Sequence, residues 1–119
     1  MSGVRGAARS DGGLLQPNEF DHRRIVRALE TRQRYRYVQP SVIPVSSGYR
    51  IESPCCSRNI DPEGGVIDVA LVLYDGRQKH WRLFRKDHER QSWEFHSVYE
   101  RLHELLEGLK IDPDRTFWQ

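Results

Sequence analysis

Three short runs of alternating residues, joined by polar turns, constrain the fold more than any other feature of this chain. Residues 66–76 read VIDVALVLYDG and end at Asp75-Gly76, a dipeptide typical of hairpin turns. Residues 79–87 (KHWRLFRKD) and 92–97 (SWEFHS) continue the two-residue alternation. Connections this short join neighbouring antiparallel strands, so the sequence predicts an antiparallel meander. The residues expected on one face of the first strand are Ile67, Val69, Leu71 and Leu73.

A leucine-rich segment follows the meander and has the spacing of an amphipathic helix. Ser97 and Glu100 stand three residues apart, as in a capping box, which predicts that the helix begins at Ser97. Asp112-Pro113 is expected to end it. The residues predicted on the apolar side of this helix are Val98, Leu102, Leu105, Leu106 and Leu109. Because a helix with one apolar side must bury it, we expect this helix to pack on the apolar face of the meander.

The N-terminal half predicts a second helix and one further strand. Asn18 is a suitable N-cap for a helix over residues 19–32. The predicted apolar face of this helix consists of Phe20, Ile25, Val26 and Leu29. Pro40 and Pro44 argue against a long regular element, and residues 48–52 alternate as a short strand at the sheet edge.

These elements predict an α+β fold. It consists of an antiparallel β-meander of 3–5 strands, an N-terminal helix, and a C-terminal amphipathic helix packed on one face. A chain of 119 residues has room for one core, so we expect a single domain over residues 18–119 after a flexible tail at residues 1–17. No apolar run reaches the roughly 18 residues of a membrane-spanning helix, and the N-terminus lacks the apolar core of a secretory signal. We therefore expect no membrane association and a cytoplasmic location.

The only two cysteines, Cys55 and Cys56, are adjacent in the turn-rich stretch SPCCSRNIDPEGG at residues 53–65. A zinc site usually spaces its cysteines two to four residues apart, whereas adjacent side chains in extended chain point apart. The pair is therefore a weak metal candidate, and small reduced thiols in a loop are the favoured interpretation. Arg58 is a candidate anion contact, but turn formation by the surrounding residues is the favoured interpretation of this stretch. No cofactor is expected.

Arginine and tyrosine alternate between residues 32 and 37. Arginine neutralises phosphate and tyrosine stacks on unpaired bases, which suits single-stranded nucleic acid. Both residue types are also enriched at the energetic centres of protein–protein interfaces. The same alternation fits an exposed segment that faces an acidic helix of its own chain. The candidate contact residues are Arg32, Arg34, Tyr35, Arg36 and Tyr37, together with Arg82 and Arg85 on the outer face of the sheet.

Two large aromatic residues, Phe117 and Trp118, stand at the C-terminus. Side chains of this size are unfavourable in water. Two alternatives follow: the pair folds back onto the core, or it docks on a partner.

The sequence carries no recognisable catalytic signature. It has no Gly-x-Ser-x-Gly motif, no histidine pair with ligand spacing on a helix, and no glycine-rich nucleotide fingerprint. His80, His88 and His96 occur in the meander, but a catalytic histidine also needs a nucleophile and a pocket. We therefore expect a protein that is not an enzyme.

The order of these features resembles a known family. The W-R-L-F-R-K-D-H…W pattern that contains Trp81 and Trp93, the Asp112-Pro113 dipeptide and the terminal Phe117-Trp118 pair are similar to domain-of-unknown-function family 3024. The resemblance covers roughly residues 20–119. It implies a small bacterial, cytoplasmic protein, and it brings no known reaction, cofactor or functional residue.

These observations lead to one functional prediction and one alternative. The prediction is a non-catalytic binding or accessory protein that contacts a protein partner, or a second copy of itself, through its arginine- and aromatic-rich surface. It would then act as a small subunit of a larger complex. The alternative is a protein that binds single-stranded nucleic acid through residues 32–37.

Overall fold

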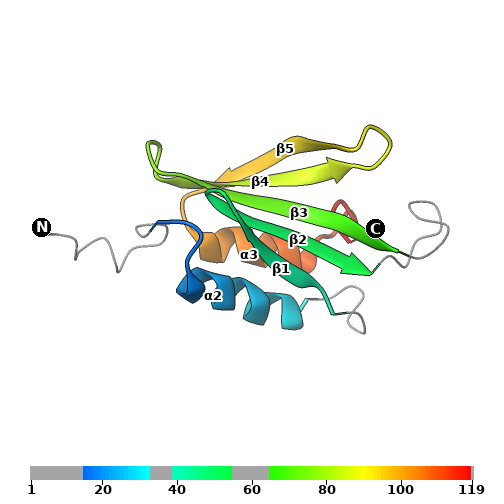
Figure 1. Ribbon diagram of the computed structural model, residues 1–119, viewed down its shortest axis with the longest axis horizontal. Coiled ribbons are helices and arrows are strands. Elements are labelled where there is room, and N and C mark those ends of the chain that lie inside the picture. Colours follow the sequence, from blue (N-terminus) through cyan, green and yellow to red (C-terminus); the bar gives the residue numbers. More distant parts are fainter. Residues whose placement is uncertain (1–14, 33–38, 55–64, 119) are drawn as a thin grey trace, which may run out of the picture.

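The computed structural model describes residues 15–32, 39–54 and 65–118. Its elements are helix α2 (Glu19–Glu30), strands β1 (Ser41–Val45), β2 (Gly48–Pro54), β3 (Val66–Asp75), β4 (His80–Asp87) and β5 (Ser92–Tyr99), and helix α3 (Leu102–Ile111). The strands form one antiparallel sheet in the order β1-β2-β3-β4-β5. Both helices lie on the same side of this sheet (Figure 1). The predicted α+β fold is confirmed.

The N-terminal helix begins where the sequence predicts. The backbone N–H of Asp21 donates to Asn18 Oδ1 at 2.8 Å, which caps the first turn. Ile25 and Leu29 are buried as expected, but Phe20 is 64% exposed. Phe20 precedes Ile25 by five residues, or about 140° around the helix, so the two side chains cannot share the buried face. The predicted position of Phe20 in the core is wrong.

The strand predicted at residues 48–52 is not at the sheet edge. β2 lies between β1 and β3, and the edge is formed by the short strand β1, which contains Pro44. Proline lacks a backbone donor and is tolerated on an edge strand. At the start of β2, a Cβ atom added to Gly48 would lie 1.9 Å from the carbonyl oxygen of Val72. Glycine therefore permits the close approach of β2 to β3.

A bulge in β3 reverses the side-chain alternation that the sequence predicts. Ile51 pairs with Ala70 and Glu52 pairs with Asp68, so Val69 is an extra residue on β3. Val69, Ala70 and Val72 are all buried against the helices. Beyond the bulge, Leu71 and Leu73 therefore lie on the other side of the sheet. Their predicted place on the core face with Val69 is wrong.

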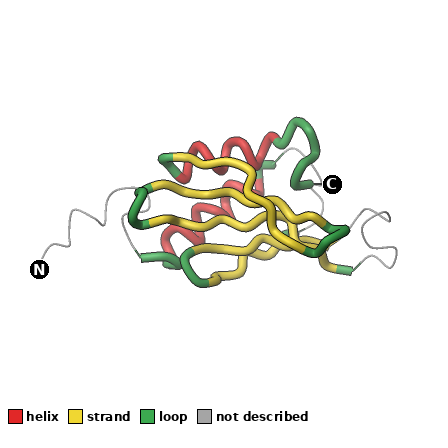
Figure 2. The backbone as a smooth tube through the Cα atoms, turned by 90° about the horizontal axis from the view of Figure 1, so that it is seen from above, coloured by secondary structure: helices red, strands yellow, loops and turns green. Residues whose placement is uncertain are grey.

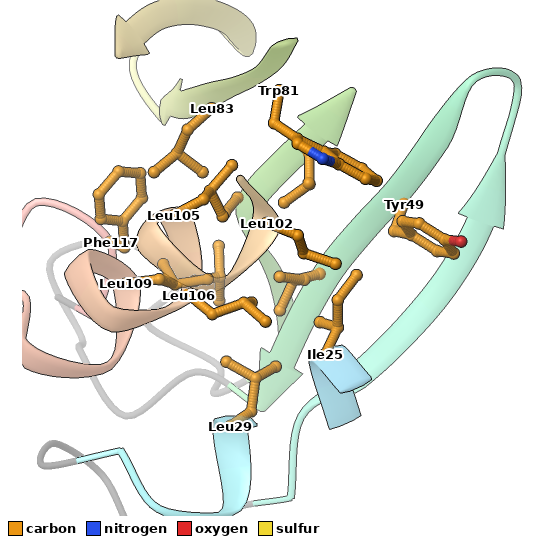
Figure 3. Close-up of a cluster of buried hydrophobic side chains, with 14 of the residues drawn as sticks. Ile25, Leu29, Tyr49, Trp81, Leu83, Leu102, Leu105, Leu106, Leu109 and Phe117 are labelled. Atoms are coloured by element: carbon orange, nitrogen blue, oxygen red, sulfur yellow. The ribbon is translucent and has the colours of Figure 1, made fainter. Parts of the chain in front are cut away.

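The C-terminal helix begins later than the capping-box pattern predicts. Ser97 and Val98 belong to β5, where they pair with Leu83 and Arg82, and the helix starts at Leu102. The predicted capping box is therefore wrong, and Val98 is 47% exposed. Strand pairing prevails here because it satisfies backbone groups along β4 that a helix at Ser97 would leave unpaired. The other residues predicted on the apolar side of this helix are buried in the core: Leu102, Leu105, Leu106 and Leu109 (Figure 3).

The chain end folds back onto this core. Phe117 is 4% exposed and Trp118 is 2% exposed. The carboxylate of Asp112, which ends α3 in the left-handed conformation, accepts hydrogen bonds from the backbone N–H groups of Thr116, Phe117 and Trp118 at 2.9, 3.0 and 2.8 Å. Trp118 Nε1 donates to the carbonyl oxygen of Leu109 at 2.9 Å. The alternative in which these aromatic residues dock on a partner is wrong, because both are core residues.

Candidate functional site

The predicted contact residue Arg32 does not belong to an exposed surface. It is 3% exposed, its guanidinium lies 4.6 Å from the ring of Trp118, and Nη1 donates to the carbonyl oxygen of Leu29 at 2.7 Å. Burial lowers the pKa of Arg32 from its ordinary value. Arg32 therefore joins α2 to the chain end, and its predicted role as a surface contact is wrong. The other predicted residues of this segment, and those of the cysteine stretch, lie outside the described residues: Arg34, Tyr35, Arg36, Tyr37, Cys55, Cys56 and Arg58.

The two arginines predicted on the outer sheet face lie on opposite sides of the sheet. Side chains alternate along a strand, so residues 82 and 85 point in opposite directions. Arg82 lies on the side away from the helices, and its Nη2 donates to Asp75 at 3.0 Å. Arg85 shares the helix side with the buried residues Trp81 and Leu83, and it pairs with Glu94 at 2.8 Å. The prediction is wrong for Arg85.

The side of the sheet opposite α2 and α3 is here called the outer face. In the described part of the chain no helix lies over it, as the view onto the sheet in Figure 2 shows. A solvated antiparallel face is expected to be mainly polar. Pairing register places nine aliphatic or aromatic residues of the described strands on this face: Ile43, Val45, Val66, Leu71, Leu73, Phe84, Trp93, Phe95 and Val98.

Three of these apolar residues form one row across three strands. Leu71 pairs with Phe84, and Phe84 pairs with Phe95. The rings of Phe84 and Phe95 meet edge to face with their centroids 5.8 Å apart. Phe95 is 58% exposed. We call Leu71, Phe84 and Phe95 the apolar stripe.

An ion-pair network borders the apolar stripe. Arg50 Nη1 donates to Glu52 at 2.6 Å and to Asp68 at 2.8 Å, and Lys86 Nζ donates to Asp68 at 3.0 Å. The hydrogen bonds that Arg50 donates to Asp68 and Glu52 raise the pKa of Arg50. Burial opposes ionisation of Asp68, but the hydrogen bonds from Lys86 and Arg50 outweigh it and lower the pKa of this carboxyl. Lys86 also lies 4.9 Å from the ring of Trp93, in cation–π contact.

A polar depression of about 410 Å³ lies at the end of this network. His88 and Gln91, from the β4–β5 turn, contribute to its wall. Burial, followed by the charge of Lys86, lowers the pKa of His88, which favours its neutral form. The residues that line the depression are Arg50, Glu52, Val66, Ile67, Asp68, Lys86, His88 and Gln91. None of these is a serine, threonine or cysteine that could serve as a nucleophile.

Within residues 15–32, 39–54 and 65–118, no three histidine, cysteine, aspartate or glutamate side chains are grouped so that they could hold a metal ion. The same ranges contain no helix that is long and apolar enough to cross a membrane.

The alternation in β4 could have identified part of the outer face from the sequence. Trp81 and Leu83 alternate with Arg82 and Phe84 along residues 79–87, so this alternation alone puts Phe84 on the side opposite to Trp81 and Leu83. Leu71 could not be found in this way, since its position depends on the bulge at Val69.

Comparison with known proteins gives a family but no characterised relative. No curated protein and no solved structure matches the chain. The family described as "Domain of unknown function (DUF3024)" matches residues 15–119, which include all the elements described above. The resemblance inferred from Trp81, Trp93 and the C-terminal motif is therefore confirmed, and the chain belongs to this family.

Proposed function

We propose that this chain is a non-catalytic cytoplasmic binding protein that contacts a partner protein through its outer face, as a small subunit of a larger complex. The observation that carries the proposal is the apolar stripe on a sheet side that no described helix covers. Phe95 and Val98 remain 58% and 47% exposed there. Contiguous exposed apolar residues with polar neighbours are typical of interaction sites.

The charges on the outer face favour a protein partner over nucleic acid. Three cations, Arg50, Arg82 and Lys86, are each hydrogen-bonded to an acidic residue of the same face: Glu52, Asp68 or Asp75. The face therefore carries no net charge from these residues, whereas nucleic-acid affinity depends on cations that neutralise phosphates. Arg32, the first residue of the proposed nucleic-acid segment, is buried against Trp118.

Several features of the polar depression support a non-catalytic role. Lys86 Nζ is engaged in a hydrogen bond to Asp68, whose pKa is lowered by the hydrogen bonds from Lys86 and Arg50 despite its burial, so this amine is not free to act as a nucleophile. His88 makes no side-chain hydrogen bond to another described residue that would orient it as a base. Among its described lining residues, the depression thus shows no paired base and nucleophile of the kind that covalent catalysis uses.

The proposal predicts that Phe95→Glu abolishes partner binding and that Phe20→Glu does not. Both side chains are exposed phenylalanines, at 58% and 64%, but Phe20 lies on α2 and Phe95 on the outer face. A charge at residue 95 would be desolvated by a partner that covers the apolar stripe. The measurement is capture of partners from lysate of the native host by each immobilised variant, read by mass spectrometry.

Circular dichroism melts of wild type, Phe95→Glu and Phe20→Glu are the control, because they check that each variant is folded. Proteins retained equally by wild type and Phe95→Glu would contradict the use of the outer face. Captured molecules that no longer bind the immobilised protein after nuclease treatment would instead support the nucleic-acid alternative.

A further inference from the structure

The edges of the sheet are poor places for a partner to add a strand. β1 has five residues and contains Pro44. β5 is irregular at His96, because Leu83 pairs with Ser97 while the next residue, Phe84, pairs with Phe95. Short strands, proline and bulges are the devices that prevent pairing between sheet edges. A partner is therefore expected on the face of the sheet.

We infer that the occupant of the outer face is a second copy of this chain, packed outer face against outer face. The inference rests on the proposed function, because both use the same surface. A face with a net charge would repel its own copy across a two-fold axis. Here the charges of Arg50, Arg82 and Lys86 are matched by paired carboxylates, so no such repulsion opposes self-association.

The arrangement of the outer face suits packing between two sheets. When two sheets pack face to face, their strands stay within about 30° of each other and the sheets lie about 10 Å apart. The apolar stripe runs across β3, β4 and β5, so two copies related by a two-fold axis can bring their stripes together. Phe95 and Phe84 of each copy would then be buried by the other. The product is a four-layered dimer with both sheets inside and the helices of each copy outside.

The size of the outer face sets the expected strength of the dimer. Five strands about 4.8 Å apart and three rows of side chains about 7 Å apart give a patch about 20 Å on each side. This patch therefore covers about 400 Å², which is about half of the roughly 800 Å² that stable complexes usually bury on each partner. We therefore expect a weak, reversible dimer whose population rises with protein concentration.

Sedimentation equilibrium over a range of concentrations tests the inference with the full-length chain. Phe95→Glu is expected to raise the dimer dissociation constant at least about ten-fold, because it places two like charges in an apolar contact. Phe95→Leu keeps an apolar side chain and should retain the dimer. Phe20→Glu, on the opposite side of the molecule, should leave the dissociation constant unchanged within about two-fold.

Amide chemical shifts in nuclear magnetic resonance spectra, recorded at low and high concentration, locate the contact. The inference expects changes at Leu71, Phe84 and Phe95 and none on the exposed side of α2. A protein that is monomeric at every soluble concentration would overturn the second-copy occupant. It would leave the proposed function intact, since capture of a different partner that depends on Phe95 would still support that proposal. A dimer that persists in Phe95→Glu, or one whose shifts map to the helices, would also overturn the inference.

Discussion

Asp112 illustrates how a single side chain fixes the end of this chain. It is 3% exposed, it adopts the left-handed conformation at φ 39°, and its carboxylate accepts three backbone hydrogen bonds from residues 116–118. A carboxylate satisfies these donors better than a neutral group, since charge-assisted hydrogen bonds are stronger. The sequence identified Asp112-Pro113 as a helix stop. It gave no sign of this second role, because the three donors come from residues further along the chain.

Substitution of Asp112 should therefore destabilise the fold in a graded way. Asp112→Ala leaves buried backbone donors without an acceptor and places alanine in an unfavourable conformation, so we expect a loss of about 2–4 kcal/mol in the free energy of unfolding. Asp112→Asn keeps one acceptor oxygen and tolerates the left-handed region, so its loss should be smaller. Urea denaturation followed by tryptophan fluorescence measures both. Equal stability of wild type and Asp112→Ala would show that the hydrogen bonds contribute nothing net.

At the scale of elements, local patterns predicted which segments are helix or strand, but not where they end. The sequence predicted the meander, the N-cap at Asn18 and the leucines of α3, all of which depend on neighbouring residues in the chain. It failed at the Ser97 capping box and at Leu71, where the outcome depends on pairing with another strand. A capping box is a local preference of about 1 kcal/mol, and additional ladder pairs in β5 can outweigh it.

The packing of α3 on the sheet predicts a sharp contrast between two substitutions in one helix. Leu105 is fully buried, so Leu105→Asp places an unpaired charge in the core and should cost more than about 4 kcal/mol. For a small domain this is enough to abolish the folded state or nearly so. His103→Asp, at an exposed position in the first turn of the same helix, should melt like wild type. Thermal melts by circular dichroism provide the comparison, and a cooperative wild-type melt for Leu105→Asp would mean that the core is elsewhere.

At the scale of the whole molecule, both described helices lie on one side of the sheet (Figure 1), and Phe117 and Trp118 belong to the core cluster that these helices share with the sheet. Trp118 contacts Arg32, so the end of the chain is joined to the end of α2. The sequence predicted that the C-terminal helix packs on the apolar sheet face, but it did not assign the N-terminal helix to a side, and it left two alternatives for Phe117 and Trp118. It did not predict the composition of the other side, since both the bulge in β3 and the ion pairs among β2, β3 and β4 depend on contacts between distant residues.

Removal of residues 116–119 tests this closure of the molecule. The truncated chain loses the buried side chains of Phe117 and Trp118 and exposes Leu109 and Arg32, so we expect the free energy of unfolding to fall by about 3 kcal/mol or more. Denaturant unfolding of the truncated and full-length chains gives the difference. Unchanged stability would contradict the assignment of these aromatics to the core and revive their docking on a partner.

The strict alternation of β4 has a consequence for how this family can diversify. Trp81 and Leu83 serve the interior, while Arg82 and Phe84, interspersed between them, serve the opposite side. Under the proposed function, variation at residues 82 and 84 would therefore alter the proposed contact surface without repacking the interior. Homologues that share this architecture are free to have diverged in their associations.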